Sequence, residues 1–189
     1  ATWASIANTS YVTGGVTRYA ICYRTLAASY TPGTVTMTWA NLVDEAEYVL
    51  YEVAGIDTTG SNGSGAIAQS GTATSTTGTT ATLTLSSAIL TGSATMGVVA
   101  DSSVSSSVRT PGTGYTEYRD HGYQWSVDPD LGPGVGSEFE ARLGGNTVVA
   151  ATMAGTGWAL VGIEIKALAG LTGRRTSHGT GTRIGSRGL

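Results

Sequence analysis

Apolar and polar residues alternate in short stretches along most of this chain, which is the period-two pattern of half-buried β-strands. Residues 16–26 place Tyr19, Ile21 and Tyr23 on one face, and residues 34–39 alternate threonine with larger apolar residues. Further strands are expected at residues 48–54, 66–75, 79–86, 96–100, 115–125, 138–143, 147–154 and 158–167.

About ten short strands with no sustained helical periodicity predict an all-β fold, a two-sheet antiparallel β-sandwich of jelly-roll or lectin-like type. A closed barrel is the second choice. Residues 48–54 are apolar on both faces and are expected to form a central strand. In residues 158–167 we expect Glu164 and Lys166 to face water, opposite the odd-numbered apolar positions.

The composition supports β structure but names no chemistry. Thr, Ser and Gly make up roughly two-fifths of the 189 residues, and 12% are charged. The hydrophobic share of 40% argues against wholesale disorder, and no apolar run is long enough to span a membrane. Glycine has no three-residue period, which excludes collagen.

The charge divides the chain into two parts. Residues 1–169 hold six basic and thirteen acidic side chains, whereas residues 170–189 hold four arginines and no acid. We therefore expect a β-sandwich domain at 1–169 and a basic C-terminal arm at 170–189 that has too few apolar residues to fold alone. Such an arm would lie on a neighbouring protein chain. The expected partner-binding residues are Arg174, Arg175, Arg183 and Arg187.

Candidate catalytic groups are sparse. His121 stands beside Asp120, but no G-x-S-x-G motif supplies a serine nucleophile to accompany them. Glu138 and Glu140 lie on one strand, where they cannot flank a glycosidic bond as a hydrolase requires. We expect no enzymatic activity.

Metal and cofactor signals are equally weak. Four aspartates in expected loops could offer oxygen ligands to Ca²⁺, but they match no calcium-binding motif, and turn formation explains them better. These aspartates are Asp57, Asp101, Asp128 and Asp130. The glycines at 132, 134 and 136 lack the strand and helix of a nucleotide site. We expect no cofactor and no metal, and we interpret Cys22, the single cysteine, as a buried thiol.

An aromatic group is the best candidate for a ligand surface. Its members could stack on a glycan or pack at an interface between proteins, and both alternatives stay open. They are Tyr115, Tyr118, Tyr123 and Trp125. The four arginines of the arm could contact phosphates, but they make a weak footprint on an acidic body, so no nucleic-acid partner is expected.

Three blocks of sequence resemble a β-sandwich domain of phage and bacterial surface or structural proteins. The blocks are YEVAGIDTT at 51–59, GTGYTE at 112–117 and WALVGIEIK at 158–166, in the family's order, and the resemblance covers about residues 1–168. It implies a jelly-roll-like sandwich on virions, as a head decoration protein, head fibre or minor tail protein, without enzymatic activity. The arm departs from the family's pattern.

These observations predict a non-enzymatic virion structural protein, specifically a capsid decoration (cement) protein on the head of a tailed bacteriophage. Its expected partners are the major capsid protein or other virion proteins and further copies of itself, a trimer being the first guess. No membrane partner is expected. The alternative is a minor tail, fibre or surface lectin-like module that binds host glycans.

Overall fold

The computed structural model describes residues 3–25, 34–41, 50–101, 109–122, 136–143, 147–166 and 177–178. Their secondary structure is almost entirely β, apart from one 3₁₀ helix, η1, at Ser61–Ala66. The strands are β1 Ala4–Thr13, β2 Val16–Arg24, β3 Tyr51–Glu52, β4 Ile67–Ser75, β5 Thr80–Thr84, β6 Ala94–Asp101, β7 Thr110–Pro111, β8 Thr116–Gly122, β9 Gly136–Leu143, β10 Val148–Thr152, β11 Trp158–Ile165 and β12 Ser177–His178.

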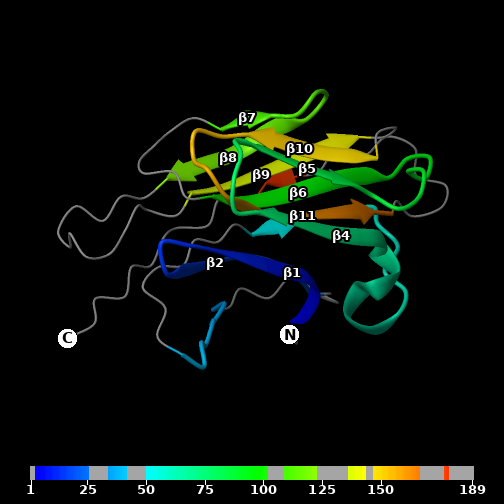
Figure 1. Cartoon of the computed structure of the whole chain (residues 1–189). Helices are drawn as coiled ribbons and strands as arrows, with labels where there is room; N and C mark the ends of the chain where they lie inside the picture. The colour runs from blue at the N-terminus through cyan, green and yellow to red at the C-terminus, as the bar shows by residue number, and fades with distance from the viewer. Residues whose placement is uncertain are drawn as a thin grey trace.

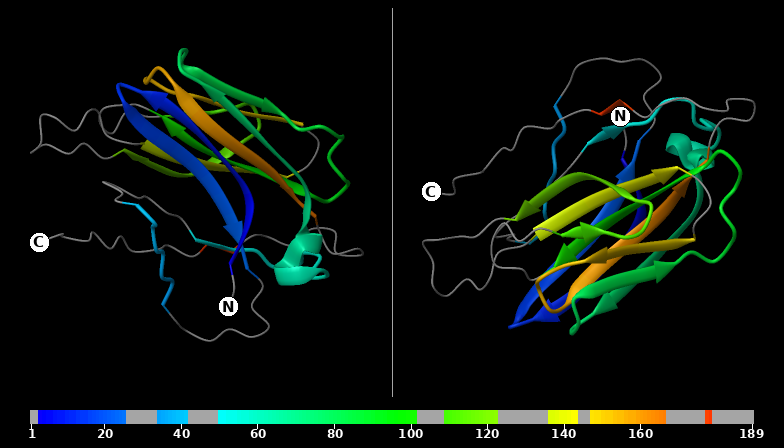
Figure 2. Two further views of the ribbon diagram at one scale, coloured as in Figure 1. Left: turned by 60° about the horizontal axis from the view of Figure 1, so that its bottom comes forward. Right: turned by 90° about the horizontal axis from the view of Figure 1, so that it is seen from above.

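The strands form an antiparallel sandwich with a third layer on one side (Figure 1). A five-stranded sheet of order β4-β11-β6-β9-β8 packs on a three-stranded sheet of order β5-β10-β7. The β1–β2 hairpin lies on the opposite face of the five-stranded sheet, across β4, β11 and β6 (Figure 2). The predicted all-β antiparallel sandwich of about ten strands is confirmed.

Strand β11 is the centre of the molecule, and all eight of its residues are buried. Its two faces contribute to two different apolar clusters, because successive side chains of a strand point to opposite sides. Trp158 and Leu160 join the cluster beneath the three-stranded sheet, together with Leu83 and Val149. The cluster beneath the hairpin receives Ala159, Val161, Ile163 and Ile165, with Tyr11, Ala20, Met96 and Ala100.

A row of glycines crosses the five-stranded sheet. Gly162 on β11 pairs with Gly71 on β4 and with Gly97 on β6. A Cβ atom at Gly162 would lie 2.7 Å from Leu83 Cδ2, and one at Gly97 would lie 2.5 Å from Val149 Cγ1. The row is therefore a groove in the sheet surface that receives two side chains of the facing sheet, and it allows the two sheets to approach closely.

Most expected strands are present with shifted ends, but two are wrong. Residues 34–41 are exposed and contain no strand. Of the expected central strand at 48–54, residues 48–49 lie outside the described residues. Within 50–54 only the two residues of β3 are in a strand, and they pair with β12 of the arm. Alternation indicates which face a strand would bury, but whether a partner strand is available is decided by the rest of the fold. The first strand, Ala4–Thr13, precedes all of the strands expected above.

Candidate functional site

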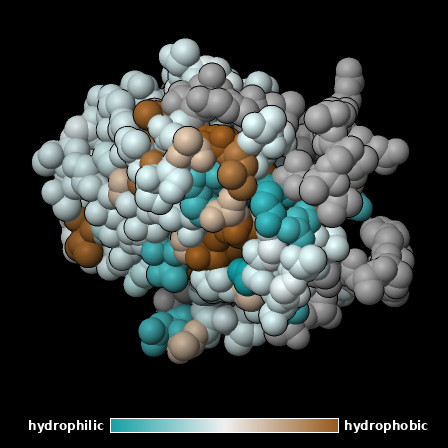
Figure 3. All heavy atoms as spheres, turned by 90° about the vertical axis from the view of Figure 1, so that its right-hand side faces the viewer, coloured by the Kyte–Doolittle hydropathy of each residue, from teal (hydrophilic) through white to brown (hydrophobic). Residues whose placement is uncertain are grey.

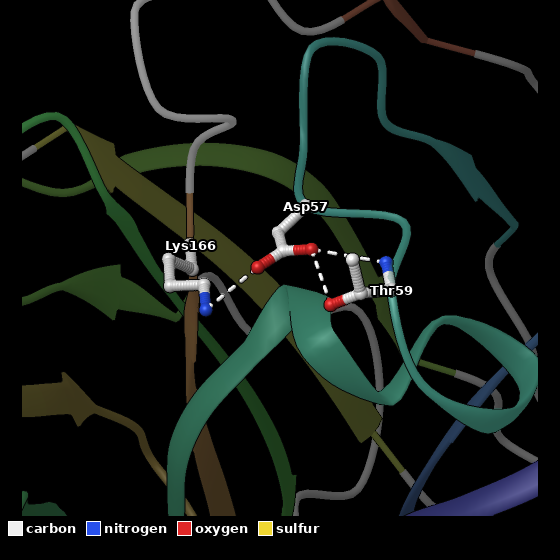
Figure 4. A network of polar contacts seen from close by, with 3 residues as sticks. All are labelled: Asp57, Thr59 and Lys166. Atoms are coloured by element: carbon white, nitrogen blue, oxygen red, sulfur yellow. Dashed lines mark hydrogen bonds and ion pairs between the residues drawn. The ribbon is translucent and has the colours of Figure 1, made fainter.

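The most developed polar network joins the first and last of the three sequence blocks (Figure 4). Asp57 lies in the loop between β3 and η1, and Lys166 directly follows β11. Asp57 Oδ2 is 2.7 Å from Lys166 Nζ. Thr59 donates two hydrogen bonds to Asp57 Oδ1, from its backbone N–H at 2.9 Å and from its hydroxyl at 2.7 Å. One carboxylate thus connects two segments that are far apart in the sequence.

The backbone holds the same two segments together. Asp57 N–H donates to the carbonyl of Lys166 at 3.2 Å, and Lys166 N–H donates to the carbonyl of Ala66 at 2.7 Å. The hydrogen bond from Lys166, followed by those from Thr59, holds the pKa of Asp57 well below its usual range, because each stabilises the ionised form. Asp57 is therefore a charged structural clamp at neutral pH.

This arrangement offers little to a metal ion. Both carboxylate oxygens of Asp57 already have partners from the protein, and one of those partners is a cation. Within the described ranges, no three His, Cys, Asp or Glu side chains gather where they could hold a metal. Of the other aspartates considered for Ca²⁺, Asp128 and Asp130 lie outside the described residues.

Asp101, also expected in a loop, is instead the last residue of β6 and is fully buried. Its Oδ1 accepts a hydrogen bond of 2.7 Å from Nη2 of Arg109, which is also fully buried. The pair joins the residues on either side of segment 102–108. Burying either charge without a partner would cost free energy, so each of the two buried charges requires the other. The pair therefore has a structural role.

A third network ties the end of β11 to the loop before β6. Glu164 is 1% exposed, so the expectation that it faces water is wrong. Its Oε1 accepts the backbone N–H of Leu90 at 2.7 Å, and its Oε2 accepts the amide of Gln69 at 2.6 Å. Gln69 also binds the backbone of Ser87 through both of its amide atoms. Glu164 lies on the face of β11 that the alternation predicts, but the loop before β6 covers this position.

The end of the sandwich that carries η1 is shown in Figure 3. Apolar surface is visible there in small patches within a larger surface of polar and weakly polar residues. Among the side chains beyond residue 39 whose burial is described, Leu90 is the one large apolar side chain that is strongly exposed, at 49%.

The second sequence block, GTGYTE, builds a turn and a core contact. Tyr115 N–H donates to the carbonyl of Gly112 at 3.0 Å, and Gly114 has a φ of 82°, which favours glycine. A Cβ atom at Gly112 would lie 2.6 Å from the carbonyl oxygen of Ala150. Tyr115 is 8% exposed, and its hydroxyl is 3.0 Å from that of Thr95.

The burial of Tyr115 corrects its assignment as a glycan or interface aromatic, because a ring within the core cannot stack on a ligand. The backbone of Tyr118 lies in β8, whereas Tyr123 and Trp125 lie outside the described residues. The four arm arginines, Arg174, Arg175, Arg183 and Arg187, also lie outside them. The arm contributes one described element, β12, which pairs with β3 of the same chain.

The candidate catalytic residues fall on two neighbouring strands. Asp120 and His121 are in β8, and their backbone partners in β9 are Glu138 and Ser137. Glu140 pairs with Glu117 in the same ladder. Cys22 is on the inner face of the hairpin, where burial raises the pKa of its thiol to about 12. This agrees with its interpretation as a buried thiol.

The sequence did not reveal that apolar side chains are exposed in the N-terminal part of the chain. Where side-chain burial is described, which leaves aside residues 118–122, 136–143 and 177–178, all of the strongly exposed large apolar side chains except Leu90 lie within residues 3–39. They are Trp3, Val12, Tyr19, Tyr23, Val35, Met37 and Trp39. The shared face of Tyr19 and Tyr23 was predicted, but the pattern alone could not say that this face points to solvent.

No protein-family model, curated protein or solved structure matches this chain. Within the described ranges, no helix is long and apolar enough to cross a membrane.

Proposed function

We propose that this chain is a non-enzymatic structural protein of a virion, a decoration protein that binds the head lattice of a tailed bacteriophage. The virion assignment comes from the resemblance of its three sequence blocks to phage and bacterial structural sandwiches. The proposed partners are the major capsid protein and further copies of the chain.

The roles of the block residues support a scaffold function. Asp57 and Lys166 form a clamp, Gly112 and Gly114 shape a turn, and Tyr115 lies in the core. Charged groups in enzyme sites are left accessible to a substrate, whereas these groups are already bound to one another. A sheet covered on both faces and fastened by buried polar pairs gives a rigid body, which suits an exposed layer on a particle.

The observation that carries the assembly role is the pairing of β12 with β3. Ser177 pairs with Glu52, and His178 pairs with Tyr51. Strand addition of this kind depends mainly on backbone hydrogen bonds, so an arm of a neighbouring copy can make the same contacts as the chain's own arm. The basic arm can thereby link acidic bodies on a lattice.

The experiment is to measure the chain's copy number in purified virions by quantitative mass spectrometry. Hundreds of copies support head decoration. A few copies, or a dozen, support a tail or fibre protein instead, and absence from virions contradicts the proposal. Occupancy of particles by a chain lacking residues 170–189 then tests the arm, whose role is contradicted by unchanged occupancy.

A further inference from the structure

Two apolar ridges are exposed in the N-terminal part of the chain. The first is the outer face of β2, where Tyr19 and Tyr23 are 61% and 54% exposed and Ile21 lies between them. Val12 of β1, 54% exposed, lies on the same face because its partner in the ladder is Thr17. We call these four residues the hairpin ridge.

The second ridge is formed by Val35, Met37 and Trp39, which are 38%, 44% and 45% exposed. We call it the threonine-flanked ridge, because threonines at 34, 36 and 38 separate its members. The three members of the hairpin ridge that lie on β2 repeat every second residue, as do the three members of the threonine-flanked ridge. In strand conformation, Tyr19 and Tyr23 would be about 13 Å apart, as would Val35 and Trp39, at roughly 3.3 Å per residue. The β2 part of the hairpin ridge therefore matches the threonine-flanked ridge in period and length.

Within one chain the ridges do not cover each other. Each side chain of the second ridge, and each of Val12, Tyr19 and Tyr23, is at least 38% exposed. The described segment 34–41 has no ladder partner, although its alternating sequence is typical of a strand. An alternating segment of this kind gains stability only when another surface covers its apolar side.

The charge distribution identifies that surface. Residues 1–43 contain no acidic side chain, and of their two arginines Arg18 is 3% exposed. Residues 44–169 contain all thirteen acids and only four basic residues. Two copies of this acidic body repel each other through most of their surface, but they can approach through the N-terminal region, which has no acidic side chain.

We propose that the hairpin ridge is the docking surface for the threonine-flanked ridge of a second copy, in a reciprocal two-fold pair. This inference rests on one part of the proposed function, the association of copies of the chain, and it specifies the surface through which they associate. In such a pair each copy supplies both ridges, as a self-complementary interface requires.

The area is sufficient for a specific contact. Six half-exposed side chains at roughly 80 Å² each, on both copies, would bury on the order of 1,000 Å² in total, the lower bound for a specific interface. A polysaccharide fits the ridges less well. Sugar rings stack on aromatic faces, but Val12, Ile21, Val35 and Met37 interrupt the aromatic residues with aliphatic ones.

The first test is sedimentation of the purified full-length chain over a range of concentrations. We expect a concentration-dependent dimer whose dissociation constant rises at least tenfold in Tyr19→Lys and in Met37→Lys. The matched control is Leu90→Lys, which places the same charge at an exposed apolar position outside both ridges and should dimerise normally. Circular dichroism and thermal unfolding verify that each variant is folded. A monomer at all concentrations, or equal weakening by Leu90→Lys, overturns the proposal.

The second test is disulfide trapping, which the sequestered thiol of Cys22 does not disturb. A Tyr19→Cys chain mixed with a Met37→Cys chain should give a covalent dimer under mild oxidation. A mixture of Tyr19→Cys with Leu90→Cys should give much less. Equal trapping in both mixtures overturns the proposal. The proposal is also overturned if the chain is monomeric and binds glycans on an array through these tyrosines.

These outcomes are separable from those of the virion experiment. A monomer that is found in virions in hundreds of copies overturns the ridge interface and supports head decoration. A ridge-dependent dimer that is absent from virions supports the interface and contradicts the virion assignment.

Discussion

Asp57 and Lys166 form a salt bridge of 2.7 Å at the end of β11, although most strands of the sandwich lie between them in the sequence. Thr59 completes the network, and the backbone of Asp57 donates to the carbonyl of Lys166. The β3–η1 loop is thereby fixed to the central strand. The partners are exposed by 16% and 38%, so water screens the pair in part.

The first prediction concerns the pH dependence of this clamp. Because the pKa of Asp57 is lowered on folding, its stabilising effect is complete above the unfolded pKa of about 3.9 and declines as the pH falls further toward the folded pKa. Asp57→Asn should melt at a lower temperature than the native chain at pH 7. This difference should narrow steadily between pH 4 and pH 2, as followed by circular dichroism. A difference that is constant over this range contradicts the assignment.

The second prediction concerns the glycine row. Gly162→Ala should reduce the free energy of unfolding by about 1–3 kcal/mol, because the new methyl group would overlap Leu83. Urea unfolding measures the change. Leu83→Ala removes the overlapping atoms, so the double variant should lose less stability than the two single losses added together. Simple additivity would mean that the two residues do not meet in the folded chain.

The third prediction concerns the buried ion pair. Arg109→Met leaves the carboxylate of Asp101 without its guanidinium partner in the interior and should cost about 3–5 kcal/mol in urea unfolding. The double variant Asp101→Leu, Arg109→Met removes both charges and should recover much of this loss. If the single variant is as stable as the native chain, the pair is not buried in solution.

The fourth prediction concerns Cys22. Since burial raises its pKa to about 12, the thiol stays protonated at pH 8 and should react slowly with a thiol reagent such as DTNB. Labelling should accelerate to the rate of a free cysteine when urea unfolds the chain. Rapid labelling of the folded protein would contradict its position on the inner face of the hairpin.

The strand pattern of the sandwich was largely readable from alternation. Residues Ala81, Leu83 and Leu85 alternate with polar residues and are buried as a half-buried strand requires. Segment 34–39 shows an equally clear alternation and forms no strand. The difference lies in the partner: β5 pairs with β10, whereas 34–39 has no ladder partner in the described chain. A local pattern contains no information about that partner.

The candidate site was less readable. From the sequence, Asp57 was considered only for Ca²⁺ or a turn, and Lys166 was expected to face water. Their contact could not be inferred, because it depends on the fold and not on a spacing in the sequence. Tyr115 was grouped with nearby aromatics because they are close in sequence, and the turn at Gly114 directs it into the core. No sequence signal distinguished the outward from the inward face of the hairpin.

The sequence by itself determined the all-β class and the inward face of strands such as β5, because side-chain direction in a strand follows a period of two. It also determined the charge distribution, with all thirteen acidic residues in 1–169 and four arginines without an acid in 170–189. Only the tertiary structure decided which residues meet: Asp57 with Lys166, Asp101 with Arg109, and the glycine row with Leu83 and Val149. Such contacts arise from strand order and sheet packing, which are properties of the whole chain.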